Sequence, residues 1–258
     1  MLLCSEIGNN WTEIDTHFKK SKISISYPLV KKDSTRNRSF DRPIELKDRK
    51  YVSAERSFDS RYVLIADISR YFPTIYTHTI SWALHGKKYA KAHINDELLL
   101  GTRLDRCVRN TQDAQTLGIP IGPDTSHILA EIIGTEIDFK LQEKIGSDLK
   151  GWRHVDDFHL FFKSQGDVEN ALHILHGILK EYELEINPQK TEIIKLPLPL
   201  EQSWVTELRS YNFRESVKGQ QSDIINYFSK AYSFSNEFSD QSVLKYTIEN
   251  SEKPPCDR

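Results

Sequence analysis

The fold of this chain is decided by Leu64-Ile65-Ala66-Asp67-Ile68-Ser69-Arg70-Tyr71-Phe72-Pro73, where an apolar run ends at an aspartate. The residues Tyr62–Ala66 are rich in strand formers, which predicts a buried strand with Asp67 at its end. Pro73 suits the first turn of a helix that follows. A carboxylate in such a place is costly unless a cation meets it, so the pattern indicates a functional site.

Two later stretches add to this site. Gly118-Ile119-Pro120-Ile121-Gly122-Pro123-Asp124-Thr125-Ser126 is a glycine- and proline-rich loop that opens a helix. Arg153-His154-Val155-Asp156-Asp157-Phe158 places an acidic pair within an apolar run, and predicts a hairpin with that pair at its turn. An Asp-Asp pair alone is more often a solvated turn. The three stretches together favour one phosphoryl-transfer site with a pair of divalent metal ions.

The order of predicted elements defines the fold class. Strand, helices, strand, strand, helix, strand is the split βαβ, ferredoxin-like pattern of an α+β protein. We expect Thr125 or Ser126 to cap the helix after the loop, and Asp167 to cap the next helix. Two further strands are expected at Leu184–Ile186 and Ile193–Leu196.

Charge is unevenly distributed along the chain. Of its 258 residues, 38% are hydrophobic and 28% are charged, which is typical of a soluble globular protein. The net charge of −2 combines a net of +7 in residues 19–50, from eleven Lys/Arg and four acids, with −9 in the rest. A basic segment on an acidic body fits a phosphate-binding flap over a carboxylate site. A solvated charged loop is the alternative.

The cysteines and the hydropathy of the sequence indicate the cellular compartment of the protein. Cys4, Cys107 and Cys256 form no CxxC pair, which favours a reducing compartment and argues against a structural zinc site. The sequence has no apolar run of about 18 residues or more, and no signal-peptide pattern. We therefore expect a cytoplasmic protein with no membrane partner.

The three stretches resemble the A, B and C motifs in the palm of a reverse transcriptase, and the resemblance spans residues 25–215. It is closest to bacterial enzymes of the retron-like, abortive-infection and phage-defence lineages. The stretches that carry it are Ile68-Ser69-Arg70-Tyr71-Phe72-Pro73-Thr74-Ile75-Tyr76-Thr77-His78, Asp124-Thr125-Ser126-His127-Ile128-Leu129-Ala130-Glu131 and Leu184-Glu185-Ile186-Asn187-Pro188-Gln189-Lys190-Thr191. The resemblance implies a right-hand palm with a ferredoxin-like core, short fingers and a partial helical thumb.

The resemblance also implies a division of the chain. Residues 1–60 would form basic fingers that contact nucleotide and nucleic acid. Residues 61–196 would form the palm, with fingers-type helices inserted at about 87–115. Residues 197–258 would be a partial thumb or the start of a C-terminal helical region, and a fragment of a longer protein is a further alternative.

Catalytic and metal-binding roles follow from matching positions. The positions implied to hold two Mg²⁺ ions, or Mn²⁺ in their place, are Asp67, Ile68, Asp156 and Asp157. Lys190 matches a lysine that protonates the departing pyrophosphate as a general acid.

Substrate-binding roles are implied in the same way. Phe72 matches the bulky residue that excludes a ribose 2′-hydroxyl, and Ile121 stands where many relatives carry Gln. His154 stands where Tyr is usual, and is interpreted as a packing or primer contact. The remaining substrate-binding positions are Gly122 and Ser126 in the loop and the cations Lys31, Lys32, Arg38 and Arg42.

The implied function is an RNA-directed DNA polymerase that adds dNTPs to a 3′-hydroxyl or protein hydroxyl primer, in bacterial antiphage defence. Expected partners are dNTPs, an RNA template or non-coding RNA, the DNA product and a protein primer, with a homo-oligomer or an associated C-terminal helical domain left open. Untemplated protein-primed synthesis is one alternative. A catalytically silent RNA-binding scaffold is another, although clustered acidic side chains argue against it. A nucleotide cyclase palm would need a Gly-Gly-Asp/Glu hairpin, which the sequence lacks.

Overall fold

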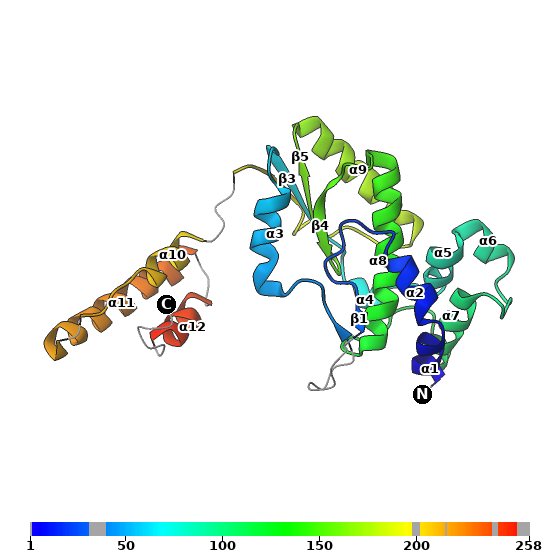
Figure 1. Cartoon of the computed structure of the whole chain (residues 1–258), viewed down its shortest axis with the longest axis horizontal. Coiled ribbons are helices and arrows are strands. Elements are labelled where there is room, and N and C mark those ends of the chain that lie inside the picture. The colour runs from blue at the N-terminus through cyan, green and yellow to red at the C-terminus, as the bar shows by residue number, and fades with distance from the viewer. Residues whose placement is uncertain (1, 31–39, 198–201, 215, 239–241, 252–258) are drawn as a thin grey trace. The chain divides into compact units, whose positions relative to one another are not determined.

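The computed structural model describes residues 2–30, 40–197, 202–214, 216–238 and 242–251 (Figure 1). Lys31, Lys32 and Arg38, predicted to bind substrate, lie outside the described residues. The chain divides into two units, Met1–Pro197 and Leu198–Arg258. Each unit is described by itself below.

A four-stranded sheet organises the first unit. Its strands are β3 (Tyr62–Asp67), β4 (Lys150–His154), β5 (Asp157–Phe162) and β6 (Glu192–Lys195), in the order β4-β5-β3-β6. Every neighbouring pair is antiparallel. This is the split βαβ arrangement predicted from the sequence, with the acidic pair at the β4–β5 turn. Two short strands, β1 (Leu29–Val30) and β2 (Phe40–Asp41), pair separately.

Helices cover both faces of this sheet. Alternate residues of the strands point to opposite faces, so Leu64 and Ala66 join one apolar core while Val63 and Phe161 join another. Figure 1 shows α8 and α9 on one side of the sheet and α3 on the other. The helices of this unit are α1 (Leu2–Asn9), α2 (Trp11–Phe18), α3 (Arg49–Arg56), α4 (Tyr71–Thr74), α5 (Thr79–His85), α6 (Lys87–Ala92), α7 (Leu100–Asn110), α8 (Asp124–Ile145) and α9 (Gln165–Glu181), with a 3₁₀ turn at Leu46–Asp48.

The second unit is helical. It contains α10 (Ser203–Arg209), α11 (Val217–Phe238) and α12 (Ser242–Ser251). Its small core is formed by Trp204, Leu208, Tyr227, Ala231 and Val243. Across the described residues of both units, the helices are too short or too polar to cross a membrane.

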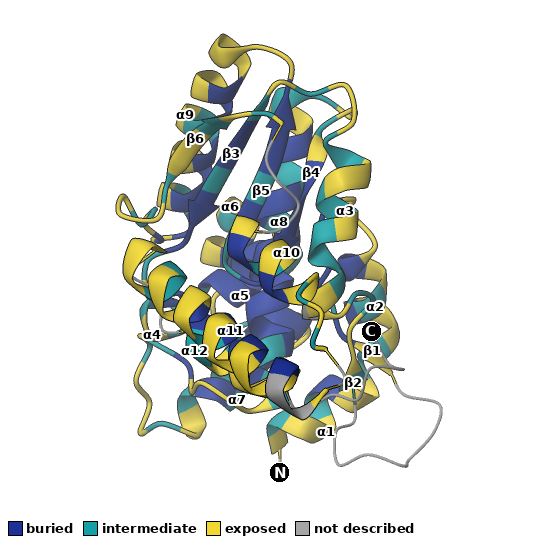
Figure 2. Ribbon diagram, turned by 90° about the vertical axis from the view of Figure 1, so that its left-hand side faces the viewer, coloured by how far each residue is buried: buried dark blue, intermediate teal, exposed yellow. Residues whose placement is uncertain are grey.

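The helix α8 is largely buried in the first unit. Figure 2 shows β3, β4 and β5 largely in the colour of buried residues, whereas β6 is mostly exposed. Two acids of α8, Glu131 and Asp138, have side chains with no exposed area. They face Arg153 of β4, whose guanidinium is also fully buried and lies 2.6 Å from Glu131 and 2.8 Å from Asp138.

Gly134 of α8 makes room for this arginine. A Cβ atom at position 134 would lie 2.7 Å from the guanidinium carbon of Arg153, closer than packed atoms come. Ser21 completes the arrangement by donating a hydrogen bond of 2.6 Å to Asp138. The sheet edge, the central helix and the N-terminal segment therefore meet at one buried cation.

Two predicted helix caps are wrong. The helix α8 begins at Asp124, and neither Thr125 nor Ser126 caps it, because both already lie inside the helix. In α9 the cap is Ser164, whose Oγ accepts the backbone N–H of Asp167 at 3.2 Å. Ser164 also donates to the Asp167 carboxylate at 2.7 Å, so Asp167 supports the cap from within the first turn.

One predicted strand is also wrong. Leu184–Ile186 forms no strand, and contributes only an isolated bridge between Ile186 and Ile68. The last strand was predicted at Ile193–Leu196 and lies at Glu192–Lys195. The segment before it instead folds around the end of β3, which affects the site described below.

The buried ion network gives a first prediction. We expect Arg153→Met to lower the free energy of unfolding by about 3–5 kcal/mol, because it leaves two buried carboxylates without their cation. Denaturant unfolding followed by circular dichroism measures this loss. As a control, Lys163→Met removes the exposed ion pair with Asp59 and should cause no measurable loss. Equal effects of the two substitutions would contradict the assignment.

Candidate active site

The three predicted catalytic aspartates meet at one end of the sheet. Asp67 is the last residue of β3 and pairs in register with Asp157, the first residue of β5. The backbone N–H of Ile68 donates to the carbonyl of Asp156 at 3.2 Å, which joins the end of β3 to the β4–β5 turn. Antiparallel pairing of β3 with β5 therefore brings together acids that lie about ninety positions apart in the sequence.

The carboxylates repel one another. Asp67 is only 4% exposed, and Asp156 and Asp157 are half-buried. Burial raises the pKa of Asp156, and the charge of Asp67 raises it further. Burial also raises the pKa of Asp157, with additional contributions from Asp156 and Asp67. Such a cluster is stabilised by added positive charge.

The donor set has the chemistry that Mg²⁺ requires. Three carboxylates offer hard oxygen ligands, and waters can complete the coordination. Within the part of the chain that the structure describes, no group of three His, Cys, Asp or Glu side chains is already arranged to hold a metal ion. The ligand types present are therefore suited to a divalent cation. Asp67 is also hydrogen-bonded to other residues of the protein.

Those partners come from the segment after α9. The ammonium of Lys190 donates to Asp67 Oδ2 at 2.9 Å, and the side-chain amide of Asn187 donates to Oδ1 at 3.1 Å. The backbone N–H of Asn187 also donates to the Asp67 carbonyl at 2.8 Å. Asn187 bonds the N–H of Gln189 through its own Oδ1, which closes a tight turn and directs Lys190 toward the site.

Lys190 keeps its charge in this position. The hydrogen bond to Asp67, together with the charge of that carboxylate, raises the pKa of Lys190. Its side chain is 63% exposed, so the ammonium remains accessible from solvent. The structure therefore places a charged lysine directly beside a predicted metal ligand.

Two arginines from the basic segment lie near the β4–β5 turn, one beside Asp157 and the other beside His154. Arg49 of α3 lies 3.7 Å from the Asp157 carboxylate. Arg42 donates to Nε2 of His154 at 3.2 Å. Burial, and then the charges of Arg49 and Arg42, lower the pKa of His154 to about 4, so the imidazole is neutral and accepts this bond. Arg42 was predicted from the sequence, whereas Arg49 was one of eleven cations with nothing to single it out.

The predicted nucleotide-binding loop, residues 118–126, is hydrogen-bonded to the segment after β3. The backbone N–H of Ile119 donates to the carbonyl of Phe72 at 2.9 Å, which places this loop beside the predicted sugar-contacting residue. Phe72 is half-buried and packs against the main core. Ile121 is 74% exposed, and Gly122 is exposed with φ of 116°, a conformation that favours glycine.

Ser126 has different surroundings. It lies in the first turn of α8 and is only 3% exposed, so its side chain faces the interior. Of the predicted loop contacts, Ser126 is thus the one that the fold keeps from solvent. Its contact with substrate, like that of the other loop residues, stays a prediction.

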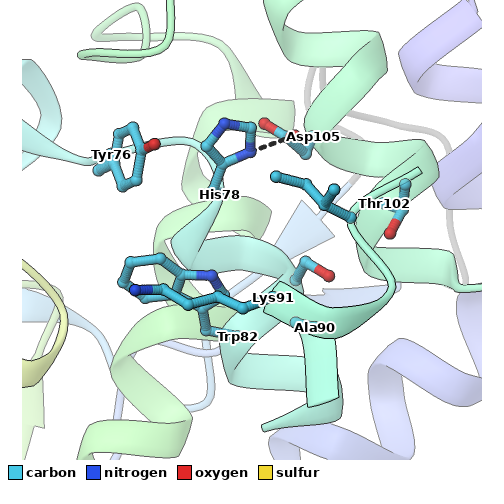
Figure 3. Close-up of a pocket in the computed structure, with 9 residues that line it drawn as sticks. Tyr76, His78, Trp82, Ala90, Lys91, Thr102 and Asp105 are labelled. Atoms are coloured by element: carbon cyan, nitrogen blue, oxygen red, sulfur yellow. Dashed lines mark hydrogen bonds and ion pairs between the residues drawn. The ribbon is translucent and has the colours of Figure 1, made fainter. Parts of the chain in front are cut away.

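A separate pocket lies among α5, α6 and α7, with a volume of about 80 Å³ (Figure 3). Tyr76 and Trp82 form part of its wall. His78 donates from Nδ1 to Asp105 at 2.7 Å, and Arg109 lies 3.3 Å from the same carboxylate. His78, Asp105 and Arg109 therefore satisfy one another, whereas Ser81 Oγ, which also lines the pocket, is buried without a hydrogen-bond partner among the described residues. None of the residues predicted for the active site lines this pocket.

The sequence and fold were compared with known proteins. The sequence pattern of the family described as reverse transcriptase (RNA-dependent DNA polymerase) matches residues 14–228. No curated protein matches the sequence.

The structure was matched to two solved telomerase structures, of which only the first reaches a TM-score above 0.5. One is apo telomerase from Candida Tropicalis truncated from its C-terminal domain, with a TM-score of 0.51 and 13% identity over 77% of this chain and 41% of that chain. The other is telomerase from Candida albicans in complex with a TWJ fragment of telomeric RNA, with a TM-score of 0.45 and 13% identity over 91% of this chain and 46% of that chain.

At this low identity, the first likeness shows the fold alone, an α+β right-hand polymerase fold. This chain spans less than half the length of either telomerase chain. The family match is more extensive, because it covers most of the chain and includes all three aspartates of the site. The chain belongs to the reverse transcriptase (RNA-dependent DNA polymerase) family.

Proposed function

We propose that this protein is an RNA-directed DNA polymerase that adds dNTPs to a 3′-hydroxyl primer. The observation that carries the proposal is the convergence of Asp67, Asp156 and Asp157 beside Lys190. A carboxylate cluster in which the pKa values of Asp156 and Asp157 are raised has a clear use in holding divalent cations, whereas a protein that only binds RNA gains nothing from repelling its phosphates. This favours catalysis over the silent scaffold.

Each residue of the site has a distinct task in this proposal. Asp67, Asp156, Asp157 and the backbone of Ile68 would hold two Mg²⁺ ions, or Mn²⁺ in their place. When bound, such ions stabilise the attacking and leaving oxygens of an in-line displacement. Lys190 carries the proton that the leaving pyrophosphate oxygen takes up as its bond to the α-phosphorus breaks.

The basic side of the site would receive the nucleotide. The guanidinium groups of Arg42 and Arg49 lie near the aspartate cluster, and arginine pairs well with phosphate oxygens. The neutral His154 accepts a bond from Arg42 and so orients it. Phe72 would pack against C2′ of the incoming sugar, with Ile121 and Gly122 of the adjacent loop lining the same pocket.

The biological setting is proposed from the sequence resemblance. The motifs are similar to those of bacterial reverse transcriptases of the phage-defence lineages, so we propose a role in antiphage defence in the cytoplasm. An RNA template or non-coding RNA would be the partner, and basic fingers in residues 1–60 would contact it. Residues 197–258 would be part of a thumb. Untemplated synthesis on a protein hydroxyl is the second candidate, because related defence enzymes work in that way.

A first test addresses the metal ligands. We expect Asp156→Asn to abolish Mg²⁺-dependent incorporation of labelled dNTPs, because it removes a ligand. Without metal, its melting temperature should equal or exceed that of the wild type, since the substitution relieves repulsion with Asp67 and Asp157. Asp148→Asn, an exposed acid before β4, is the control and should keep activity. Full activity of Asp156→Asn would overturn the assignment.

A second test addresses the general acid. We expect Lys190→Met to lower kcat by about 10²-fold or more with a smaller change in KM, because the leaving group loses its proton donor. The same variant should reach half-maximal rate at a lower Mg²⁺ concentration, since Lys190 no longer competes for Asp67. Lys195→Met on β6 is the control for loss of an exposed charge. A higher Mg²⁺ requirement for Lys190→Met would contradict this role.

A third test addresses sugar choice. Overlap between a 2′-hydroxyl and the Phe72 ring should cost about 1–3 kcal/mol, or roughly tenfold to a few hundredfold in kcat/KM. We expect Phe72→Ala to narrow the ratio of kcat/KM for dGTP over GTP while DNA synthesis continues. A ring that served only the core would instead lower stability by about 3–5 kcal/mol on truncation and leave the ratio unchanged. Steady-state kinetics and melting temperatures distinguish the two outcomes.

A further inference from the structure

The residue before the acidic pair has an unusual backbone conformation. Val155 has φ of 60°, in the left-handed region that a β-branched residue rarely enters. Such strain persists only where the surroundings enforce it, and it is often found at functional sites. Because Asp156 follows directly, the conformation of Val155 sets the direction in which both carboxylates leave the turn.

Buried side chains hold both polar backbone groups of Val155. Its N–H donates to Ser26 Oγ at 2.9 Å, and its carbonyl accepts from the Arg153 guanidinium at 2.9 Å. Ser26 has no exposed area and comes from a segment that is 129 positions earlier in the chain. The strained residue is thus bonded on each side to a group that cannot move into solvent.

Glu131 fixes those two groups in turn. Its Oε2 accepts a hydrogen bond from Ser26 at 3.0 Å, and its Oε1 lies 2.6 Å from an Arg153 nitrogen. The backbone adds rigidity, because the N–H of Ile25 donates to the Arg153 carbonyl at 2.9 Å. The N-terminal segment therefore runs along β4 and brings Ser26 beneath the turn.

We propose that Ser26 is a positioning residue for divalent-metal binding. With Glu131 and Arg153 it forms a clamp that holds Val155 in the left-handed conformation and so keeps Asp156 and Asp157 facing Asp67. The consequence for DNA synthesis rests on the proposed function. The consequence for metal affinity does not, because it depends only on where the carboxylates stand.

Ser24 provides a matched control. It is buried on the same segment, donates to the same Glu131 at 2.5 Å and accepts the backbone N–H of Ser26 at 3.3 Å, whereas the hydrogen bond to the Val155 N–H is made by the Ser26 side chain. Loss of the Ser24 hydroxyl should therefore perturb the buried network while the hydrogen bond between Ser26 Oγ and the Val155 N–H is kept. A merely structural role for Ser26 would make Ser24→Ala and Ser26→Ala behave alike.

The experiment measures Mn²⁺ binding to the full chain by electron paramagnetic resonance. We expect Ser26→Ala to weaken Mn²⁺ affinity by about tenfold or more, as is usual when a group that orients metal ligands is removed. Ser24→Ala should keep the wild-type affinity even where both variants melt at a lower temperature. Equal affinities for Ser26→Ala and the wild type would overturn the proposal.

A double-mutant cycle tests the cause. Glycine adopts a φ of 60° without strain, so a turn with Val155→Gly has less need of the clamp. We expect Ser26→Ala to reduce Mn²⁺ affinity less in the Val155→Gly background than in the wild type. The same loss in both backgrounds would show that the clamp does not act through the conformation of Val155.

A second variant and a measurement of dNTP incorporation distinguish the possible outcomes. If Ser26→Ala does not fold, Ser26→Cys replaces it, because cysteine keeps the size of the side chain and weakens the hydrogen bond. A loss of Mn²⁺ affinity relative to the wild type, smaller than tenfold, supports the clamp. No loss of Mn²⁺ affinity overturns it. If the variants behave as expected but the wild type incorporates no dNTP, the polymerase function fails and the clamp stands. If the wild type polymerises and Ser26→Ala binds Mn²⁺ normally, only the clamp fails.

Discussion

The contact between Arg153 and the two acids of α8 is the interaction on which the rest of the first unit depends. A fully buried cation would be untenable alone, and so would Glu131 and Asp138. Arg153 bonds both carboxylates, and the hydroxyl groups of Ser21, Ser24 and Ser26 donate to the same two acids. Burial raises the pKa of Asp138 to about 6. Because an ion network of this kind tolerates only one geometry, it fixes the sheet edge against the central helix more closely than apolar packing would.

The electrostatics of the proposed active site are the opposite. In the interior, every buried charge is matched by a partner, whereas Asp156 and Asp157 are left with an excess of negative charge. Lys190 and Arg49 compensate only in part, from exposed or half-buried positions. The buried ion network lies directly behind the β4–β5 turn, because Arg153 donates to the carbonyl of Val155 at 2.9 Å. The end of β4 thus adjoins both the buried ion network of Arg153 and the acidic pair of the proposed active site.

Much of this arrangement could be predicted from local sequence. An apolar run that ends in Asp67 and a second run broken by an acidic pair identify strand ends, and pairing of those strands follows from the βαββαβ order. The caps of α8 and α9 were misplaced because several Ser, Thr and Asp side chains compete near each helix start. The partners of Arg153 could not be predicted, because Asp138 and Glu131 lie 15 and 22 positions earlier on a separate helix and only the tertiary fold brings them to β4. The bond between Ser26 and Glu131, which joins residues 105 positions apart, has no local signature either.

The closeness of Gly134 to the guanidinium has a consequence for how this sequence can change over evolution. Any side chain at position 134 would collide with the arginine, and any shorter residue at position 153 would leave a void beside the bare helix backbone. Neither position can be altered alone without a loss of stability, although one is a glycine in mid-helix and the other a charged residue just before the β4–β5 turn. Related sequences should therefore exchange these two residues together or keep both.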